Sequence, residues 1–234
     1  MAIDIGWVAT YPTNSDDWIK TVLIGGVLTL LSILVVPAFL LYGYLLRVLR
    51  AGMAEADEPP VFDEWGDLLR EGVAAFVIVF LYQLIPLIVM FVTVGGSMAA
   101  MATGSEAGAG VGIVGLLGGL ALSSVLALVF SYAMLIGLAN YAHEGTFGAA
   151  FDLGVLRSVA LDKAYAVPWL YGVGVLLVAG AVAGLLGIVP ILGAIIGVFV
   201  TFYGQIAAMW LWGKGFADAT GAGSAAGGQS TATV

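Results

Sequence analysis

The sequence has no cysteine, a single histidine and no phosphate-binding loop. Without cysteine the chain can form no disulfide and no thiolate metal site, and it has no cysteine nucleophile. One histidine, His143, cannot build a zinc or copper site that needs several imidazoles. The motif Gly-x-x-x-x-Gly-Lys-Ser/Thr is also missing, which excludes a P-loop nucleotide site. We therefore expect neither a metal nor another cofactor.

Charge is scarce as well. Only 9% of the 234 residues are charged and 62% are hydrophobic, with a mean hydropathy of +1.10. Average soluble domains contain about 25% charged residues, so this composition predicts an integral membrane protein. Seven basic against fifteen acidic residues give a net charge of −8, which excludes nucleic acid as an expected partner. The stretch before Trp18 has no lysine or arginine, which argues against a cleaved signal peptide.

The charge-free stretches indicate where the chain crosses the membrane. Four stretches lack Asp, Glu, Lys and Arg: 21–46, 72–105, 107–142 and 164–213. A crossing helix needs roughly 20 apolar residues, and the turn-like sequence from Gly187 to Pro190 divides the last stretch in two. The sequence therefore predicts an all-α polytopic transmembrane helical bundle, residues 21–213. Its five spans are expected at about 21–46, 72–94, 111–141, 166–188 and 191–213.

The basic residues predict the orientation in the cell membrane. Loops rich in lysine and arginine stay in the cytoplasm, and six of the seven basic residues follow the odd-numbered spans, with only Lys20 on the other side. This pattern predicts an external N-terminal tail, 1–20, and a cytoplasmic C-terminal tail, 214–234. The residues after Lys214 are mostly Gly, Ala, Ser and Thr, which predicts disorder. In an alternative arrangement, residues 1–18 lie on the inner surface and the first span bends at Pro37 into a re-entrant pair.

Two segments between spans have the pattern of amphipathic surface helices. Apolar residues recur at three- and four-residue spacing around Trp65 and at four-residue spacing from Phe147, which predicts cytoplasmic interfacial helices at about 61–70 and 147–160. Each would lie between an incoming and an outgoing span. The chain therefore contains a possible parallel internal repeat of span, surface helix and span, followed by a fifth span.

Several short stretches resemble a known family. These are YGYLLRVLR from Tyr42, EPPVFDEWG from Glu58, DWIKT from Asp17 and GKGF from Gly213. They are similar to an archaeal family of multi-pass membrane proteins, abundant in halophiles and catalogued only as a domain of unknown function (DUF4013-like). The resemblance covers most of residues 15–216. It implies a polytopic helical membrane protein and brings with it no activity, catalytic residue or ligand.

Three amides are the most polar groups within or near the ends of the spans: Gln83, Asn140 and Gln205. An unpaired amide in hydrocarbon costs several kcal/mol, so each amide needs a partner, water or the bundle interior. They could line a hydrophilic path for a small solute. Alternatively, they could form hydrogen bonds between helices, which is the commoner role of such residues.

Arginines and glycines supply the remaining candidate residues. Arg47, Arg50 and Arg70 border the inner leaflet, where each cation can attract anionic headgroups by about 1 kcal/mol. Membrane lipids are therefore expected partners. Glycines four apart allow close helix packing, within the chain or against a second copy or another membrane protein. They occur as three pairs: Gly115 and Gly119, Gly180 and Gly184, and Gly193 and Gly197.

The sequence does not favour an enzyme. His143 and Glu144 form the only pair suited to acid–base chemistry, and no nucleophile or second base accompanies them in sequence. The spans contain no ionisable acid or base, which also argues against a proton-coupled pump. The first hypothesis is a non-enzymatic membrane scaffold or assembly component. The second is a channel or facilitator lined by the three amides.

Overall fold

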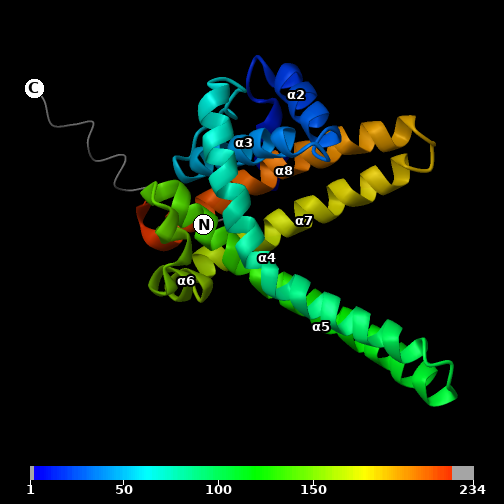
Figure 1. Ribbon diagram of the computed structural model, residues 1–234. Helices are drawn as coiled ribbons and strands as arrows, with labels where there is room; N and C mark the ends of the chain where they lie inside the picture. The colour runs from blue at the N-terminus through cyan, green and yellow to red at the C-terminus, as the bar shows by residue number, and fades with distance from the viewer. Residues whose placement is uncertain (1–2, 223–234) are drawn as a thin grey trace, which may run out of the picture. The chain divides into compact units, whose positions relative to one another are not determined.

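The computed structural model describes residues 3–222, and the regular structure in this range is entirely helical (Figure 1). The chain divides into two compact units: unit 1 comprises Met1–Phe76 with Ile136–Val234, and unit 2 comprises Val77–Leu135. The helices are α1 (Ile5–Thr10), η1 (Tyr11–Thr13), α2 (Trp18–Leu30), α3 (Val35–Met53), α4 (Trp65–Met101), α5 (Glu106–Glu144), η2 (Phe147–Phe151), α6 (Leu153–Ala160), α7 (Lys163–Leu186) and α8 (Leu192–Thr220).

Five of these helices are long and apolar enough to cross a membrane: α3, α4, α5, α7 and α8. This result confirms the all-α class and the number of candidate spans. The predicted spans at 72–94 and 111–141 are the central parts of longer helices, since α4 has 37 residues and α5 has 39. At 1.5 Å per residue these helices are about 55–60 Å long, which exceeds the ~30 Å hydrocarbon core of a bilayer.

The first predicted span is wrong in its form, because residues 21–46 are not one helix. α2 ends at Leu30 and α3 begins at Val35. The break comes before Pro37, which lies in the first turn of α3, where its missing N–H is not needed. If the helix were continuous, the proline ring would meet the carbonyl of Ile33 four residues earlier. The Ser32 hydroxyl donates to the Thr29 carbonyl at 2.7 Å and helps to close the end of α2.

The first predicted surface helix and part of the predicted tail also differ from the structure. Residues 61–64 are not helical, and residues from Trp65 onward form the start of α4, so no separate helix covers 61–70. The segment 147–160 does form short helices, η2 and α6, which meet at Asp152. α8 continues to Thr220, so residues 214–220 are helical and not disordered, and residues 223–234 lie outside the described range.

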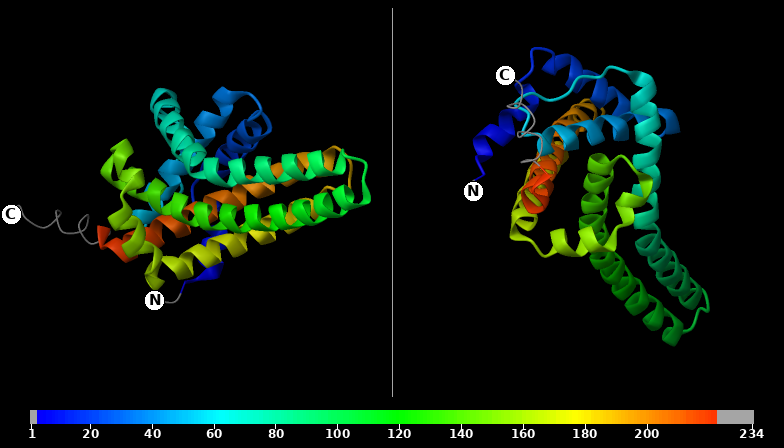
Figure 2. Two further views of the ribbon diagram at one scale, coloured as in Figure 1. Left: turned by 60° about the horizontal axis from the view of Figure 1, so that its bottom comes forward. Right: turned by 90° about the vertical axis from the view of Figure 1, so that its left-hand side faces the viewer.

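α8 is the central helix of unit 1. It pairs with α7 as an antiparallel hairpin joined by the predicted turn at Gly187–Pro190, and α3 packs on its other side (Figures 1 and 2). Glycines permit these close contacts. A Cβ on Gly193 would overlap the carbonyl of Leu186, and one on Gly213 would overlap the carbonyl of Leu49. The backbones therefore touch directly, as is usual for helices that pack in a membrane.

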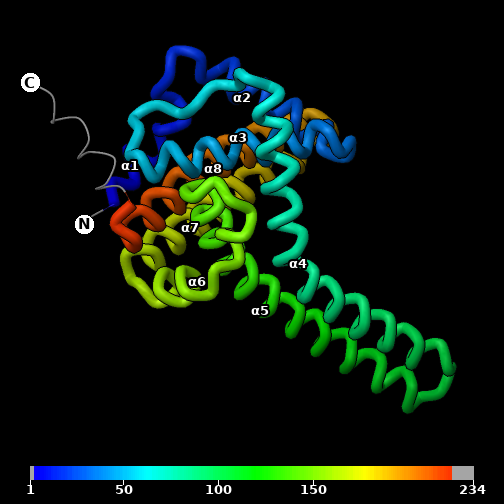
Figure 3. The backbone as a smooth tube through the Cα atoms, turned by 60° about the vertical axis from the view of Figure 1, so that its left-hand side comes forward, coloured from blue at the N-terminus to red at the C-terminus, as the bar shows by residue number. Residues whose placement is uncertain are grey.

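The N-terminal segment lies against the end of unit 1 that holds the α3–α4 connection. The Tyr11 hydroxyl donates to the Glu58 carbonyl at 3.2 Å, and the Asn14 amide donates to the Asp57 carbonyl at 3.1 Å. Trp7 packs on Trp210 near the end of α8, with ring centroids 4.5 Å apart. Figure 3 shows α1 beside this part of α8. This geometry favours the alternative in which the N-terminal segment and the α3–α4 connection share one side.

Unit 2 is a hairpin of two long apolar helix segments. The C-terminal part of α4 runs antiparallel to the N-terminal part of α5, and the two are joined by residues 102–105. Gly115 faces the Ser97 side chain, and Gly119 faces the Thr93 side chain. Thr93 and Ser97 donate to carbonyls of their own helix, which satisfies their hydroxyls in an apolar setting.

Candidate functional site

The three predicted amides have different environments. Asn140, near the end of α5 in unit 1, is buried, and its amide donates to the Ala149 carbonyl of η2 at 2.8 Å. The side-chain oxygens of Gln205 on α8 and Gln83 on α4 are buried and accept no hydrogen bond within residues 3–222. Of the three cavities described below, one has Asn140 in its wall and none has Gln83 or Gln205.

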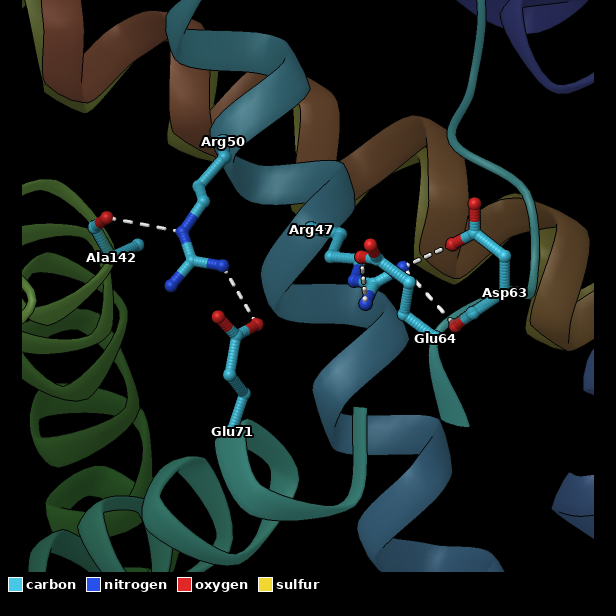
Figure 4. A network of polar contacts seen from close by, with 6 residues as sticks. All are labelled: Arg47, Arg50, Asp63, Glu64, Glu71 and Ala142. Carbon is cyan, nitrogen blue, oxygen red and sulfur yellow. Dashed lines mark hydrogen bonds and ion pairs between the residues drawn. The ribbon is translucent and has the colours of Figure 1, made fainter. Parts of the chain in front are cut away.

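Two of the three predicted arginines are held in a network inside unit 1 (Figure 4). Arg47, on α3, pairs with Asp63 and with Glu64, the latter at 3.3 Å, and its side chain is only 15% exposed. Arg50, one turn later, donates to Glu71 at 2.7 Å and to the Ala142 carbonyl at 3.1 Å.

This network fastens the ends of three helices to one another. Arg47 and Arg50 come from the last turns of α3, Glu71 from the start of α4 and Ala142 from the end of α5. Hydrogen bonds to charged groups contribute about 1.5–3 kcal/mol where they are shielded from water, and less where the pair is exposed. The third arginine, Arg70, is exposed and forms no ion pair within residues 3–222. A lipid-headgroup role for these arginines stays a prediction.

The three glycine pairs differ in whether another part of the chain covers them. Gly193 and Gly197 are covered by Leu186 and Ala183 of α7, and Gly115 and Gly119 are covered within unit 2. These two pairs therefore serve packing inside the chain. Gly180 and Gly184 on α7 have no atom within 4 Å of the position that a Cβ would occupy.

His143 and Glu144 form a weak contact at the end of α5. Their charged atoms are 3.9 Å apart, and both side chains are substantially exposed. Ser124 and Ser131 donate to carbonyls of their own helix. Within residues 3–222, no group of three or more His, Asp or Glu is placed to hold a metal ion.

An aromatic and charged cluster at the end of unit 1 was not among the candidates from the sequence. Trp7, Tyr11 and Trp210 pack together with ring centroids 4.5–5.5 Å apart. Burial raises the pKa of the Tyr11 hydroxyl, which remains a neutral donor to Glu58. Lys214 pairs with Glu55 at 3.0 Å. The four-residue spacing of Trp7 and Tyr11 was a usable signal, because it places both rings on one side of a helical turn.

Three cavities open on unit 1. The first, of about 720 Å³, lies beside this cluster and has Trp7, Lys214 and Asp57 in its wall. The second, of about 750 Å³, is lined by apolar residues of α1, α7 and α8. The third, of about 510 Å³, lies between the end of α5 and α6, with Asn140 and Asp152 in its wall.

Comparison with known proteins gives one match. A family model described as "Protein of unknown function (DUF4013)" matches residues 30–188. This range includes the stretches from Tyr42 and Glu58 on which the resemblance depended, whereas those at Asp17 and Gly213 lie outside it. The comparison with curated proteins and the comparison with solved structures found no match.

Proposed function

We propose that this chain, which belongs to the DUF4013 family of proteins of unknown function, is a non-enzymatic membrane scaffold or assembly component. One observation supports this role: the Gly180/Gly184 face of α7 is open, whereas the other two glycine pairs are covered by the chain itself. Such a face allows the close approach of a second helix in a membrane. Either a second copy or another membrane protein could supply that helix.

The neighbours of this open face suit helix association. Leu177 and Leu185 on α7 are 69% and 68% exposed, so exposed apolar side chains lie near these glycines along the helix. Lipid tails are as apolar as leucine, so close backbone packing at the glycines would supply the association energy. The Arg47 and Arg50 network keeps the ends of α3, α4 and α5 fixed, as a scaffold requires.

Association between copies can be measured by energy transfer between fluorophore-labelled proteins in liposomes. We expect transfer in the wild type and a clear loss in the variant Gly180→Leu/Gly184→Leu. Gly118→Leu, which fills an equally open helical glycine in unit 2, is the matched control and should leave transfer unchanged. Transfer that is insensitive to both substitutions would argue against assembly through α7.

A passage for a small solute or ion is the second candidate. The buried, unpartnered side-chain oxygens of Gln83 and Gln205 favour it, because a buried acceptor without a partner is costly unless water or a ligand reaches it. The hydrogen bond from the Asn140 amide to the Ala149 carbonyl favours a structural role for this amide, and so does not support a passage. Solute and ion flux from liposomes decides between the two: flux that Gln205→Leu abolishes would replace the scaffold with a passage.

The contacts of the N-terminal segment support a proposal for the orientation. Tyr11 and Asn14 bond the α3–α4 connection, which has Arg50 before it and Arg70 after it, so we place residues 4–14 on the cytoplasmic side together with Lys214. α2 and α3 then form a re-entrant hairpin, and α4, α5, α7 and α8 cross the membrane. This proposal differs from the external N-terminal tail predicted from charge alone. The short helices at 147–160 would lie in the interface on the same side.

A further inference from the structure

The first cavity of unit 1 contains charges of both signs. Its wall is built by the N-terminal segment, the α3–α4 connection, the start of α7 and the end of α8. Four carboxylates and two ammonium groups line it, so its formal charge is −2. The acidic residues are Asp4, Glu55, Asp57 and Asp218, and the basic residues are Lys163 and Lys214.

Most of these charges are already satisfied by neighbours. Lys214 pairs with Glu55 at 3.0 Å and with Asp218 at 3.3 Å, and its side chain is 12% exposed. Asp4 accepts from the Trp7 backbone N–H and caps α1. Within residues 3–222, Asp57 and Lys163 form no ion pair. One free carboxylate and one free ammonium group therefore face the same cavity.

Two indole rings complete this cavity. Trp7 and Trp210 pack against each other, and the Trp210 indole N–H donates to the Ala56 carbonyl at 3.1 Å, which fixes its ring. Indoles favour the boundary between headgroups and hydrocarbon, and their faces attract ammonium groups. The cavity is thus suited to a headgroup at the membrane surface.

The second cavity continues from the first along the same helices. Val167 lines both cavities, and α1, α7 and α8 contribute to both walls. The second wall is apolar apart from two tyrosines and includes Gly174, whose missing side chain leaves open space. Both volumes, about 720 and 750 Å³, lie within the ~300–1,000 Å³ range of ordinary ligand sites.

We propose that the two cavities together bind one phospholipid whose headgroup carries an ammonium group, such as phosphatidylethanolamine. The ammonium group binds Asp57 beside Trp7, the phosphate binds Lys163, and an acyl chain lies in the apolar cavity past Gly174. The net negative charge of the first cavity disfavours an anionic lipid, which lacks the ammonium group to offset the carboxylates. This site is independent of the Gly180/Gly184 face.

Native mass spectrometry of the delipidated full-length protein tests this site. We expect phosphatidylethanolamine to bind about tenfold more tightly than phosphatidylglycerol with the same acyl chains, the ratio expected for one hydrogen bond to a charged group. Asp57→Asn should remove this preference by weakening the ethanolamine lipid alone. Gly174→Leu, which fills the apolar cavity, should weaken both lipids.

Two matched substitutions serve as controls. Asp16→Asn removes an exposed carboxylate of the N-terminal segment outside the cavity, and Gly118→Leu fills an open glycine on another helix, so both should bind lipid as the wild type does. Equal or tighter binding of phosphatidylglycerol would overturn the proposal, as would binding that Gly174→Leu leaves unchanged. A dimer that Gly174→Leu dissociates, without any lipid preference, would assign the cavity to a second copy instead.

Discussion

At the scale of single residues, Arg50 and the nearby Arg70 have different surroundings. Arg50 joins α3 to Glu71 and to the Ala142 carbonyl, whereas Arg70 is exposed and unpaired within the described range. Arg50→Met should lower the free energy of unfolding by about 1–3 kcal/mol, because it leaves a carboxylate and a carbonyl without their donor. Denaturation in detergent measures this loss.

The control is Arg70→Met, which should change the free energy of unfolding by less than about 0.5 kcal/mol, as is usual for surface positions. Equal losses in the two variants would mean that the Arg50 contacts contribute nothing specific.

Ile191 provides a second residue-level prediction. Its φ of 64° lies in the left-handed region, which a β-branched residue rarely adopts, and it follows Pro190 at the start of α8. Ile191→Gly should therefore raise the free energy of unfolding by about 1 kcal/mol through relief of backbone strain. The midpoint of thermal unfolding in detergent reports the change. Ile188→Gly, in the same turn but without a positive φ, should give no gain, and a gain there would refute the explanation.

Residue types in the sequence identified the polar candidates but not their partners. The amide of Asn140 was correctly marked as needing a partner, yet its acceptor, Ala149, is a backbone carbonyl that no side-chain pattern identifies. Arg47 was assigned to lipid headgroups at the membrane border. Its partners in the structure are instead two acids that follow Pro60, Asp63 and Glu64. The cavity beside Trp7 was missed because its walls come from segments more than 150 residues apart.

At the scale of helices, the glycine faces of α7 and α8 should respond oppositely to the same substitution. Gly193→Ala places a methyl group on the Leu186 carbonyl and forces the two helices apart, so we expect a loss of about 2 kcal/mol or more. Gly180→Ala meets no atom and should gain up to about 1 kcal/mol from helix propensity in a monomer. Denaturation under conditions that keep the protein monomeric measures the free energy of unfolding of both variants. Losses of equal size would contradict the described α7–α8 contact.

The helices themselves could be predicted from the charge-free stretches because hydrocarbon excludes charge whatever the fold. Four of the five predicted spans correspond to α4, α5, α7 and α8. The first failed because hydropathy cannot distinguish a continuous helix from a hairpin of two. Pro37 was the relevant signal, but it lies in the first turn of a new helix, after a break at residues 31–34, instead of bending one helix in its middle.

At the scale of the whole chain, the proposed orientation predicts which positions share a side of the membrane. The natural chain has no cysteine, so single cysteines can be introduced at Asp16, Ser158 and Ala102 without background labelling. Asp16→Cys and Ser158→Cys should react with an impermeant thiol reagent from the cytoplasmic side, because the N-terminal segment bonds the α3–α4 connection. Ala102→Cys, between α4 and α5, should react only from outside.

Reaction of Asp16→Cys from outside would restore a first span that crosses the membrane completely and would separate the N-terminal segment from Glu58. Reaction of all three cysteines from the same side would contradict the crossing of α4 and α5.

The central position of α8 has a consequence for the order of events during synthesis. Among the helices of residues 3–222, α8 leaves the ribosome last, yet α1, α2, α3 and α7 all pack against it. Until it arrives, Trp7 lacks Trp210 and the backbone of Leu49 lacks the partner that Gly213 provides. The core of unit 1 therefore closes only after α8 has been synthesised, and truncation within α8 should leave the earlier helices inserted but unassembled, as substrates for membrane quality control.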